Sequence, residues 1–310
     1  MRTLVLGLAI LMLAACSSTR SARVLTPDER EATAGALVIR DGTTGERIDL
    51  DEAARRAARA DVVVMGEYHD NPDAHALQQA LYARLLAIEP RTALCLEMLE
   101  RHEQPLVDEW LAGTLTTDAL IDRTGSRTWS GQPGSWVAFY QPCLDLARGH
   151  RAPIVAANAP RQYVSRANRE GYDGLLALPE AERAGFDLPI APDVGAYRHR
   201  LAELMREMRG VDAPVPDDQV DRMLRSQRVW DATMGASVAR ALDSSPRAVL
   251  LVGCFHSDFL GGTVMELLAR RPGTIVFVVA ITGEAGETLA PGDRGRGDIV
   301  ATVGPGLGID

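Results

Sequence analysis

Five short apolar runs rich in β-branched residues recur along the chain, and they constrain its fold more than any other feature. The runs cover residues 61–66, 93–96, 152–157, 248–253 and 274–280. Stretches with helical spacing of apolar residues separate them, at about 72–89, 134–149 and 261–270. Strands that are apolar on both faces are typical of a parallel sheet covered by helices on both sides. The sequence therefore predicts an α/β fold on a mostly parallel sheet.

The segments at either end of these runs are shorter and more polar. Residues 36–40 and 47–50 flank a turn-rich segment, which is the pattern of a small N-terminal hairpin. The tail from residue 283 is rich in Gly, Pro and Asp, and its composition fits a final hairpin as well as a flexible end. The hairpin is therefore expected, and the form of the tail stays open.

The interval from about 160 to 245 shows no strand pattern. Residues 196–208 and 217–242 have helical spacing of apolar residues, and several prolines between them favour short helices joined by turns. We therefore expect a single α/β domain over residues 36–310, interrupted by an α-helical insert at about 160–245.

The first residues have the pattern of a bacterial lipoprotein signal peptide. Arg2 is the only charge before an apolar run over residues 4–15, which is too short to span a bilayer core of about 30 Å. A Leu-Ala-Ala sequence then precedes Cys16, whose thiol can take a diacylglycerol. We expect residues 1–15 to be removed and Cys16 to become the lipidated N-terminus.

The expected cellular location of the protein follows from that lipid anchor. Ser17 after the lipidated Cys16 is typical of release to the outer membrane, and residues 16–35 are expected to be a linker. Acyl chains hold a soluble domain at a membrane without a transmembrane helix. The expected location is the outer membrane, lipid-anchored, facing the periplasm or the cell surface. The net charge of −9 disfavours nucleic acid as a partner.

Polar residues follow four of the predicted strands directly. In a parallel sheet the carboxyl ends of the strands lie along one edge, where ligands bind, so we expect these residues to converge. The residues that could bind a ligand or act in catalysis are Glu67, His69, Glu97, Asn158, Arg161 and His256.

Each of these residues also has an ordinary structural role open to it. Glu67 and His69 are two residues apart and share one face if the strand continues, but either can be satisfied locally. A buried carboxylate at Glu97 is costly unless a ligand, a metal or an arginine pairs with it. Asn158 can bind a ligand or cap the next helix. Arg161 can pair with a carboxylate of a substrate or of haem.

Five ordered segments of the chain resemble the ChaN-type iron-regulated lipoproteins of the haem-binding-uptake and Tiki superfamily. The segments are residues 66–70 (GEYHD), 96–113, 136–161, 226–235 and 253–262. The resemblance extends from about residue 35 to 280, and it implies an α/β domain with a helical insert, lipid anchoring and haem binding. One departure is Phe255, which stands before the last histidine where the family suggests a small residue.

The resemblance implies that the protein binds haem or an iron complex for uptake. A haem site needs an axial Tyr, His or Met, arginines for the propionates and an apolar wall. Tyr68, Tyr140 and His256 are the candidate axial ligands, and Arg161 is the candidate propionate partner. The family also implies tyrosine ligation, with cofacial haems shared by a homodimer.

The same superfamily resembles the Tiki proteases and the erythromycin esterases, which leaves a second class of function open. As a metal-dependent hydrolase, an esterase or a protease, the chain would use His69, Glu97 and His256 to hold a divalent metal or to orient water, with Glu67 as general base. A third possibility, a noncatalytic envelope scaffold, has little support in the sequence. Fold kinship does not choose among these functions.

Overall fold

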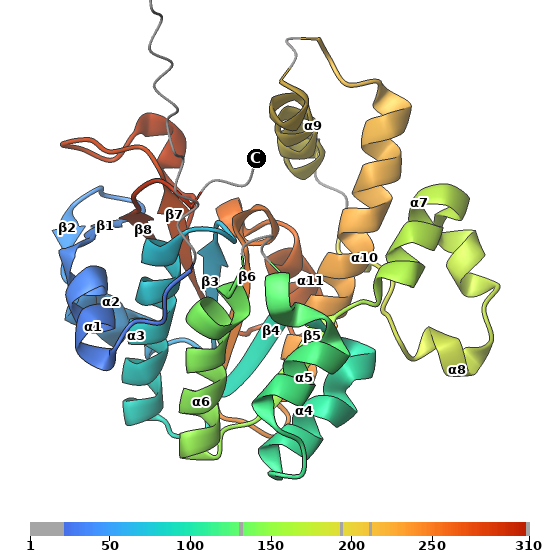
Figure 1. The fold of residues 1–310 in the computed structure, drawn as a ribbon. Coiled ribbons are helices and arrows are strands. Elements are labelled where there is room, and N and C mark those ends of the chain that lie inside the picture. Colours follow the sequence, from blue (N-terminus) through green and yellow to red (C-terminus); the bar gives the residue numbers. More distant parts are fainter. Residues whose placement is uncertain (1–21, 130–132, 193–194, 211–212, 308–310) are drawn as a thin grey trace, which may run out of the picture.

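The computed structural model describes residues 22–129, 133–192, 195–210 and 213–307. The expected signal peptide and Cys16 lie outside these residues. Helices cover both faces of one central sheet (Figure 1). The strands are β1 (Val38–Asp41), β2 (Arg47–Ile48), β3 (Val62–Glu67), β4 (Ala93–Glu100), β5 (Ile154–Asn158), β6 (Ala248–Gly253), β7 (Val276–Thr282) and β8 (Ile299–Thr302).

Helices fill the connections between these strands. The α-helices are α1 (Pro27–Ala36), α2 (Leu50–Ala57), α3 (Pro72–Ile88), α4 (Gln104–Leu111), α5 (Thr117–Thr124), α6 (Gln141–His150), α7 (Arg161–Leu176), α8 (Glu180–Arg183), α9 (Gly195–Arg209), α10 (Asp217–Ala241) and α11 (Thr263–Arg270). A π-helical turn, η3 (Trp136–Tyr140), precedes α6, and the 3₁₀ turns η4 (Cys254–His256) and η5 (Asp258–Leu260) follow β6. Within the described residues no helix is long and apolar enough to cross a membrane.

The sheet has the strand order β2-β1-β8-β7-β3-β6-β4-β5. The six strands from β8 to β5 run parallel to their neighbours, and β1 pairs antiparallel with both β2 and β8. This arrangement confirms the predicted α/β fold, its mostly parallel sheet and its N-terminal hairpin. The tail, left open by its composition, supplies β8, which joins the hairpin to the rest of the sheet.

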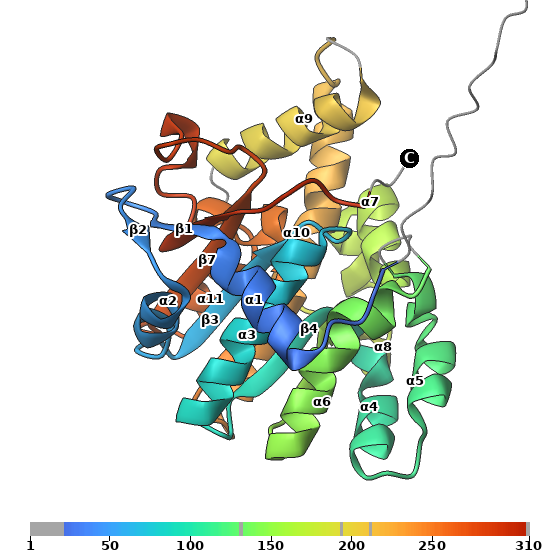
Figure 2. The same ribbon diagram turned by 60° about the vertical axis from the view of Figure 1, so that its left-hand side comes forward.

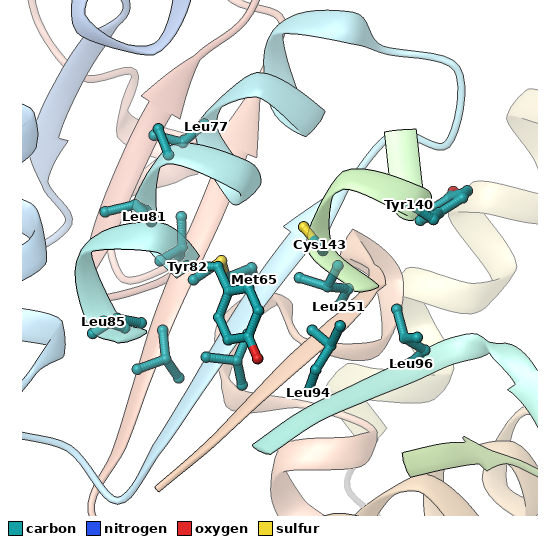
Figure 3. Close-up of a cluster of buried hydrophobic side chains, with 14 of the residues drawn as sticks. Met65, Leu77, Leu81, Tyr82, Leu85, Leu94, Leu96, Tyr140, Cys143 and Leu251 are labelled. Carbon is teal, nitrogen blue, oxygen red and sulfur yellow. The ribbon is translucent and has the colours of Figure 1, made fainter. Parts of the chain in front are cut away.

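Successive residues of the central strands face opposite layers of helices. In β3, Val63 and Met65 pack in the same core cluster as α3 and α6, whereas Val62 and Val64 pack in the cluster of α10 and α11. All four side chains are buried, and burying such an apolar side chain contributes about 1.5–3 kcal/mol. Burial on both faces explains the continuous apolar runs of the sequence. Figure 3 shows the layer between the sheet, α3 and α6.

Helix α1 occupies residues that the sequence analysis assigns to the linker. Thr26 accepts a hydrogen bond from the backbone of Glu29, whose side chain accepts one from the backbone of Thr26, so the two residues form a capping box. Pro27 at the first helical position adds a fixed φ that suits the helix. The helix lies against α3 (Figure 2), so the folded domain begins about ten residues earlier than predicted.

Four helices, α7 to α10, connect β5 to β6, where the sequence predicts a helical insert. The last of them belongs to two layers. In its first half Val220 and Leu224 pack with Leu201 of α9, and in its second half Met234 and Val238 pack under the sheet. Helix α10 is therefore the element that holds α9 at the end of the sheet where the strands finish (Figure 1).

Candidate functional site

Four of the residues predicted from the strand ends meet at the carboxyl edge of the sheet. Strands β3, β6 and β4 are neighbours, with Glu67 opposite Gly253. The backbone N–H of Gly253 donates to Glu97 Oε2 at 2.6 Å, and Glu97 Oε1 lies 3.7 Å from His256 Nε2. A Cβ on Gly253 would lie 3.0 Å from His69 Cε1, so glycine allows this ring to approach the strand. Glu67, His69, Glu97 and His256 therefore form one cluster.

Glu67 is the buried anchor of the His69 side of this cluster. Its Oε1 lies 2.8 Å from His69 Nδ1 and accepts a hydrogen bond from the Tyr140 hydroxyl at 2.7 Å, and its Oε2 accepts one from the Gln78 amide at 2.8 Å. Burial alone would raise the pKa of Glu67, but His75, His69 and Tyr140 outweigh it and lower that pKa to about 2. Glu67 is therefore a carboxylate whose oxygens are already occupied by the protein.

His69 is held between Glu67 and an aromatic wall. Its side chain is 34% exposed, and its ring meets that of Trp129 edge to face at 4.6 Å. Burial would lower the pKa of His69, but the hydrogen bond and the charge of Glu67 outweigh that effect and raise it. Because Nδ1 faces Glu67, the other ring nitrogen is the one presented to Gly253 and the open edge of the sheet.

His256 is held in the same way by a different carboxylate. Its Nδ1 lies 2.6 Å from Oδ1 of Asp231, a buried residue of α10. The hydroxyls of Tyr197 and Thr263 also donate to Asp231, at 2.6 and 2.9 Å. Burial would lower the pKa of His256, but the charge and hydrogen bond of Asp231 and the charge of Glu97 raise it to about 9. At neutral pH His256 is therefore a buried cation between two carboxylates.

The two tyrosines predicted as axial haem ligands lie in very different places. Tyr140 is fully buried and its hydroxyl donates to Glu67, so in this structure it positions Glu67 and is not open to an iron ion. The sequence could not show this because η3 turns the ring inward, against His75 and Trp136. Tyr68 is 36% exposed, and no hydrogen bond of its hydroxyl to another described residue is found.

Asn158 and Arg161 do not join the cluster directly. The Asn158 amide donates to the backbone carbonyl of Glu97, and its oxygen accepts the N–H of Ala159, so it ties β5 to β4. Helix α7 begins at Arg161, and its N-cap residue Pro160 forms no side-chain cap, so the helix-capping role considered for Asn158 is absent. Arg161 is exposed at the start of α7 and lines cavities on that side of the molecule.

The predicted metal set of His69, Glu97 and His256 has no support in the geometry. Over the part of the chain that the structure describes, no three His, Cys, Asp or Glu side chains are placed to hold one metal ion. Both histidines direct Nδ1 to carboxylates of their own, Glu67 and Asp231. The arrangement is better suited to moving protons, because each imidazole is oriented by a carboxylate and Glu97 lies between them.

Asp231 and Tyr197 belong to this site but are not among the residues predicted from the sequence. Asp231 lies on the apolar stripe of α10, seven residues from both Leu224 and Val238, which are buried. A charged residue within such an apolar stripe indicates that it has a buried partner. Tyr197 carries no such sign, because its contact with Asp231 depends on how α9 packs.

Comparison with known proteins identifies the family. The family model described as "Haem-binding uptake, Tiki superfamily, ChaN" matches residues 53–267, more than two thirds of the chain. No curated protein sequence matches significantly. Among solved structures, that of Campylobacter jejuni ChaN with cofacial haem binding aligns with a TM-score of 0.65 and 17% identity, covering 87% of this chain and 97% of that one.

A second solved structure shares the fold at greater distance. The type III effector HopBA1 aligns with a TM-score of 0.51 and 13% identity, covering 88% of this chain and 98% of that one. At these identities the structural matches establish the fold, and the family assignment comes from the sequence of residues 53–267. The chain therefore belongs to the ChaN family of the haem-binding-uptake, Tiki superfamily.

Proposed function

We propose that this protein binds haem at the carboxyl edge of its sheet, with Tyr68 as the axial ligand, and delivers it for iron uptake. One observation carries the choice of residue: Tyr68 is the exposed tyrosine beside the His69 and His256 pairs, whereas Tyr140 is buried and bonded to Glu67. Membership of a haem-binding family supports the ligand. Tyrosine is among the side chains that hold haem iron in proteins.

The chemistry of Tyr68 fits this role. Partial burial, together with nearby Cys254, raises the pKa of its hydroxyl to about 12, while Arg296 acts in the opposite direction. The hydroxyl is therefore protonated before haem arrives, and ligation through a phenolate releases that proton. Affinity for ferric haem is expected to increase with pH, by up to about tenfold per unit if this proton alone is released.

Haemin titration of the domain from residue 22 onward tests the proposal. The unchanged protein should give a saturable Soret shift, and Tyr68→Phe should weaken binding and alter the spectrum because the axial oxygen is lost. Tyr163→Phe is the matched control, since Tyr163 packs against Phe186 in a separate cluster. Binding that does not saturate, or a Tyr68→Phe spectrum identical to that of the control, would refute Tyr68 as the ligand.

We also propose that Cys16 anchors the protein in the outer membrane and that two copies associate when haem is bound. The Leu-Ala-Ala-Cys16 order supports the anchor, and the cofacial haems named for Campylobacter jejuni ChaN suggest the dimer. Cys16→Ser should abolish labelling by radioactive palmitate and release the protein from outer-membrane fractions. Sedimentation with and without haemin should show a doubling of mass, and an unchanged mass would disprove the dimer.

A second candidate function is a hydrolase, favoured by the two carboxylate–histidine pairs. Glu67 orients His69, Asp231 orients His256, and Glu97 lies between the two rings. The charged His256 can donate a proton or stabilise an oxyanion, and His69 in its neutral form can accept a proton from water. Glu67 is too completely bonded to act as the base itself, which revises the role expected for it.

Ester hydrolysis separates the two candidates. A hydrolase should turn over p-nitrophenyl acetate, and Glu97→Gln should reduce kcat by about 10²–10⁴-fold if Glu97 takes part in proton transfer. Glu284→Gln, at an exposed position in the tail, is the matched control. Absence of turnover in the unchanged protein would remove the hydrolase candidate and leave the haem proposal untouched, and turnover that is equal in both variants would exclude Glu97 from proton transfer.

A further inference from the structure

A cavity lies between α7 and α10, and none of the residues of the His69 and His256 pairs lines it. Its volume is about 300 Å³. Side chains from both helices form its walls, among them Arg161, Asn168, Arg169, Met223 and Trp230. Cavities of this size accept small organic ligands.

Two guanidinium groups of this cavity have no partner. Neither Arg161 nor Arg169 forms a side-chain ion pair or hydrogen bond with any described residue, and no acidic residue lines the cavity. The nearby acids have other partners: Glu170 pairs with Arg166, Asp218 pairs with Arg222, and Glu100 accepts the backbone N–H of Arg161 at 3.0 Å. In a chain of net charge −9, such a concentration of unpaired positive charge favours an anionic ligand.

The rest of the lining is apolar or held in place. Trp230 and Met223 supply an indole ring and a thioether, which suit a hydrocarbon chain. The Asn168 amide donates to Ser226 and to the backbone carbonyl of Arg222, so residues that line the cavity link α7 to α10. The walls are therefore preformed.

The spacing of the two arginines sets the shape of the ligand. Arg161 and Arg169 are eight residues apart on one side of α7, before its break at Gly171. At 1.5 Å per residue their backbones are about 12 Å apart along the helix axis. One compact anion does not fill both positions, whereas a molecule with an acidic group at each end does.

We propose that this cavity binds an elongated amphipathic dicarboxylate. One carboxylate pairs with Arg161, the other pairs with Arg169, and the chain between them lies along Trp230 and Met223. This assigns to Arg161 the carboxylate-binding role that its sequence context suggested, at a place separate from the cluster of Glu67, His69, Glu97 and His256. The site does not depend on haem binding.

Sebacate and its monomethyl ester are the probes, because the ester keeps the length of the chain and removes one charge. Calorimetric titration should show one sebacate per protein, with the ester about tenfold weaker, since a charge-assisted hydrogen bond is lost. Arg161→Gln and Arg169→Gln should each weaken sebacate about tenfold. Arg47→Gln, an exposed arginine of β2, is the matched control and should not change binding.

Three further measurements complete the test. Sebacate should change the tryptophan fluorescence of the protein, and Trp230→Phe should abolish that change, because the other described tryptophans lie outside the cavity. Haemin titration should be the same in Arg161→Gln and in unchanged protein. Sebacate binding that survives both arginine substitutions, or that haemin displaces in a one-to-one manner, would overturn the proposal, whereas failure of haemin to bind would affect only the haem function.

Discussion

The two histidines of the site are held by matching sets of side chains drawn from different parts of the chain. His69 faces Glu67, which also accepts the Tyr140 hydroxyl, and His256 faces Asp231, which also accepts the Tyr197 hydroxyl. The His69 set comes mainly from β3 and α3, within twelve residues of sequence. The His256 set joins α9, α10 and η4. In the first set the carboxylate and its histidine are local partners and only the tyrosine comes from a distant segment, whereas in the second set tertiary packing brings all three residues together.

The two sets differ in which partner, the carboxylate or the histidine, is buried with a strongly shifted pKa. Glu67 is buried with its pKa lowered to about 2, while His69 is one third exposed. In the other set His256 itself is buried with its pKa raised to about 9. The first set therefore guarantees an anion and the second guarantees a cation. Each charge makes the stability of the fold depend on the partner that neutralises it.

The largest expected effect comes from removing either buried carboxylate. Asp231→Asn leaves the His256 cation without its close partner, and Glu67→Gln removes the anion to which three side chains are directed. Breaking a buried pair costs about 3–5 kcal/mol. Urea denaturation at pH 7 should show a loss of this size for both variants.

An exposed pair provides the control for this comparison. Asp243 binds Arg271 at the surface, and Asp243→Asn should cost less than about 1 kcal/mol because solvent screens the pair. If Asp231→Asn is no more destabilising than Asp243→Asn, the His256 set is not the buried ion pair described here.

The next largest effect is on the pH dependence of stability. Each set should contribute about 3 kcal/mol to the free energy of unfolding, and the two contributions should be lost over different pH ranges. The folded pKa of His256, about 9, exceeds the usual value of 6.5, so its contribution is complete below pH 6.5 and is lost as pH rises through 9. The folded pKa of Glu67, about 2, lies below 4.5, so its contribution is complete above pH 4.5 and is lost as pH falls toward 2.

Unfolding free energies measured against pH for the unchanged protein, His256→Gln and Glu67→Gln test both directions. The difference between unchanged protein and His256→Gln should shrink between pH 6.5 and 9, and the difference for Glu67→Gln should shrink below pH 4.5. Parallel curves over these ranges would contradict the charge states assigned to the two sets.

The sequence was sufficient to predict the fold and the convergence of four side chains at the strand ends. The apolar runs predicted the parallel sheet, because apolar and polar residues do not alternate along a strand that is buried on both faces. The positions of Glu67, His69, Glu97 and His256 at strand ends predicted that their side chains would converge. The predicted start of the domain, residue 36, was too late, although the sequence contains the signature of a helix before it. Thr26 and Glu29 have the spacing of a capping box.

The rest of the site depends on packing that no local pattern encodes. Tyr140 is only three residues from Val137, which is exposed, and only the turn η3 decides that the tyrosine points inward to Glu67. Tyr197 reaches Asp231 across 34 residues through the seating of α9 on α10. Periodicity can indicate that Asp231 is buried, but it cannot identify His256 as its partner.

The smallest effect, and the sharpest comparison, comes from the two tyrosine hydroxyls. Tyr197 is the hydrogen-bond partner found for Oδ2 of Asp231, whereas Tyr140 shares Oε1 of Glu67 with His69. Tyr197→Phe should therefore leave a buried carboxylate oxygen without a donor and cost about 2 kcal/mol, and Tyr140→Phe should cost about 1 kcal/mol less because His69 remains bonded to that oxygen. Tyr163→Phe again serves as the control, measured with the others by urea denaturation at pH 7. Equal losses of stability for Tyr197→Phe and Tyr140→Phe would show that the His256 set depends on its tyrosine no more than the His69 set does.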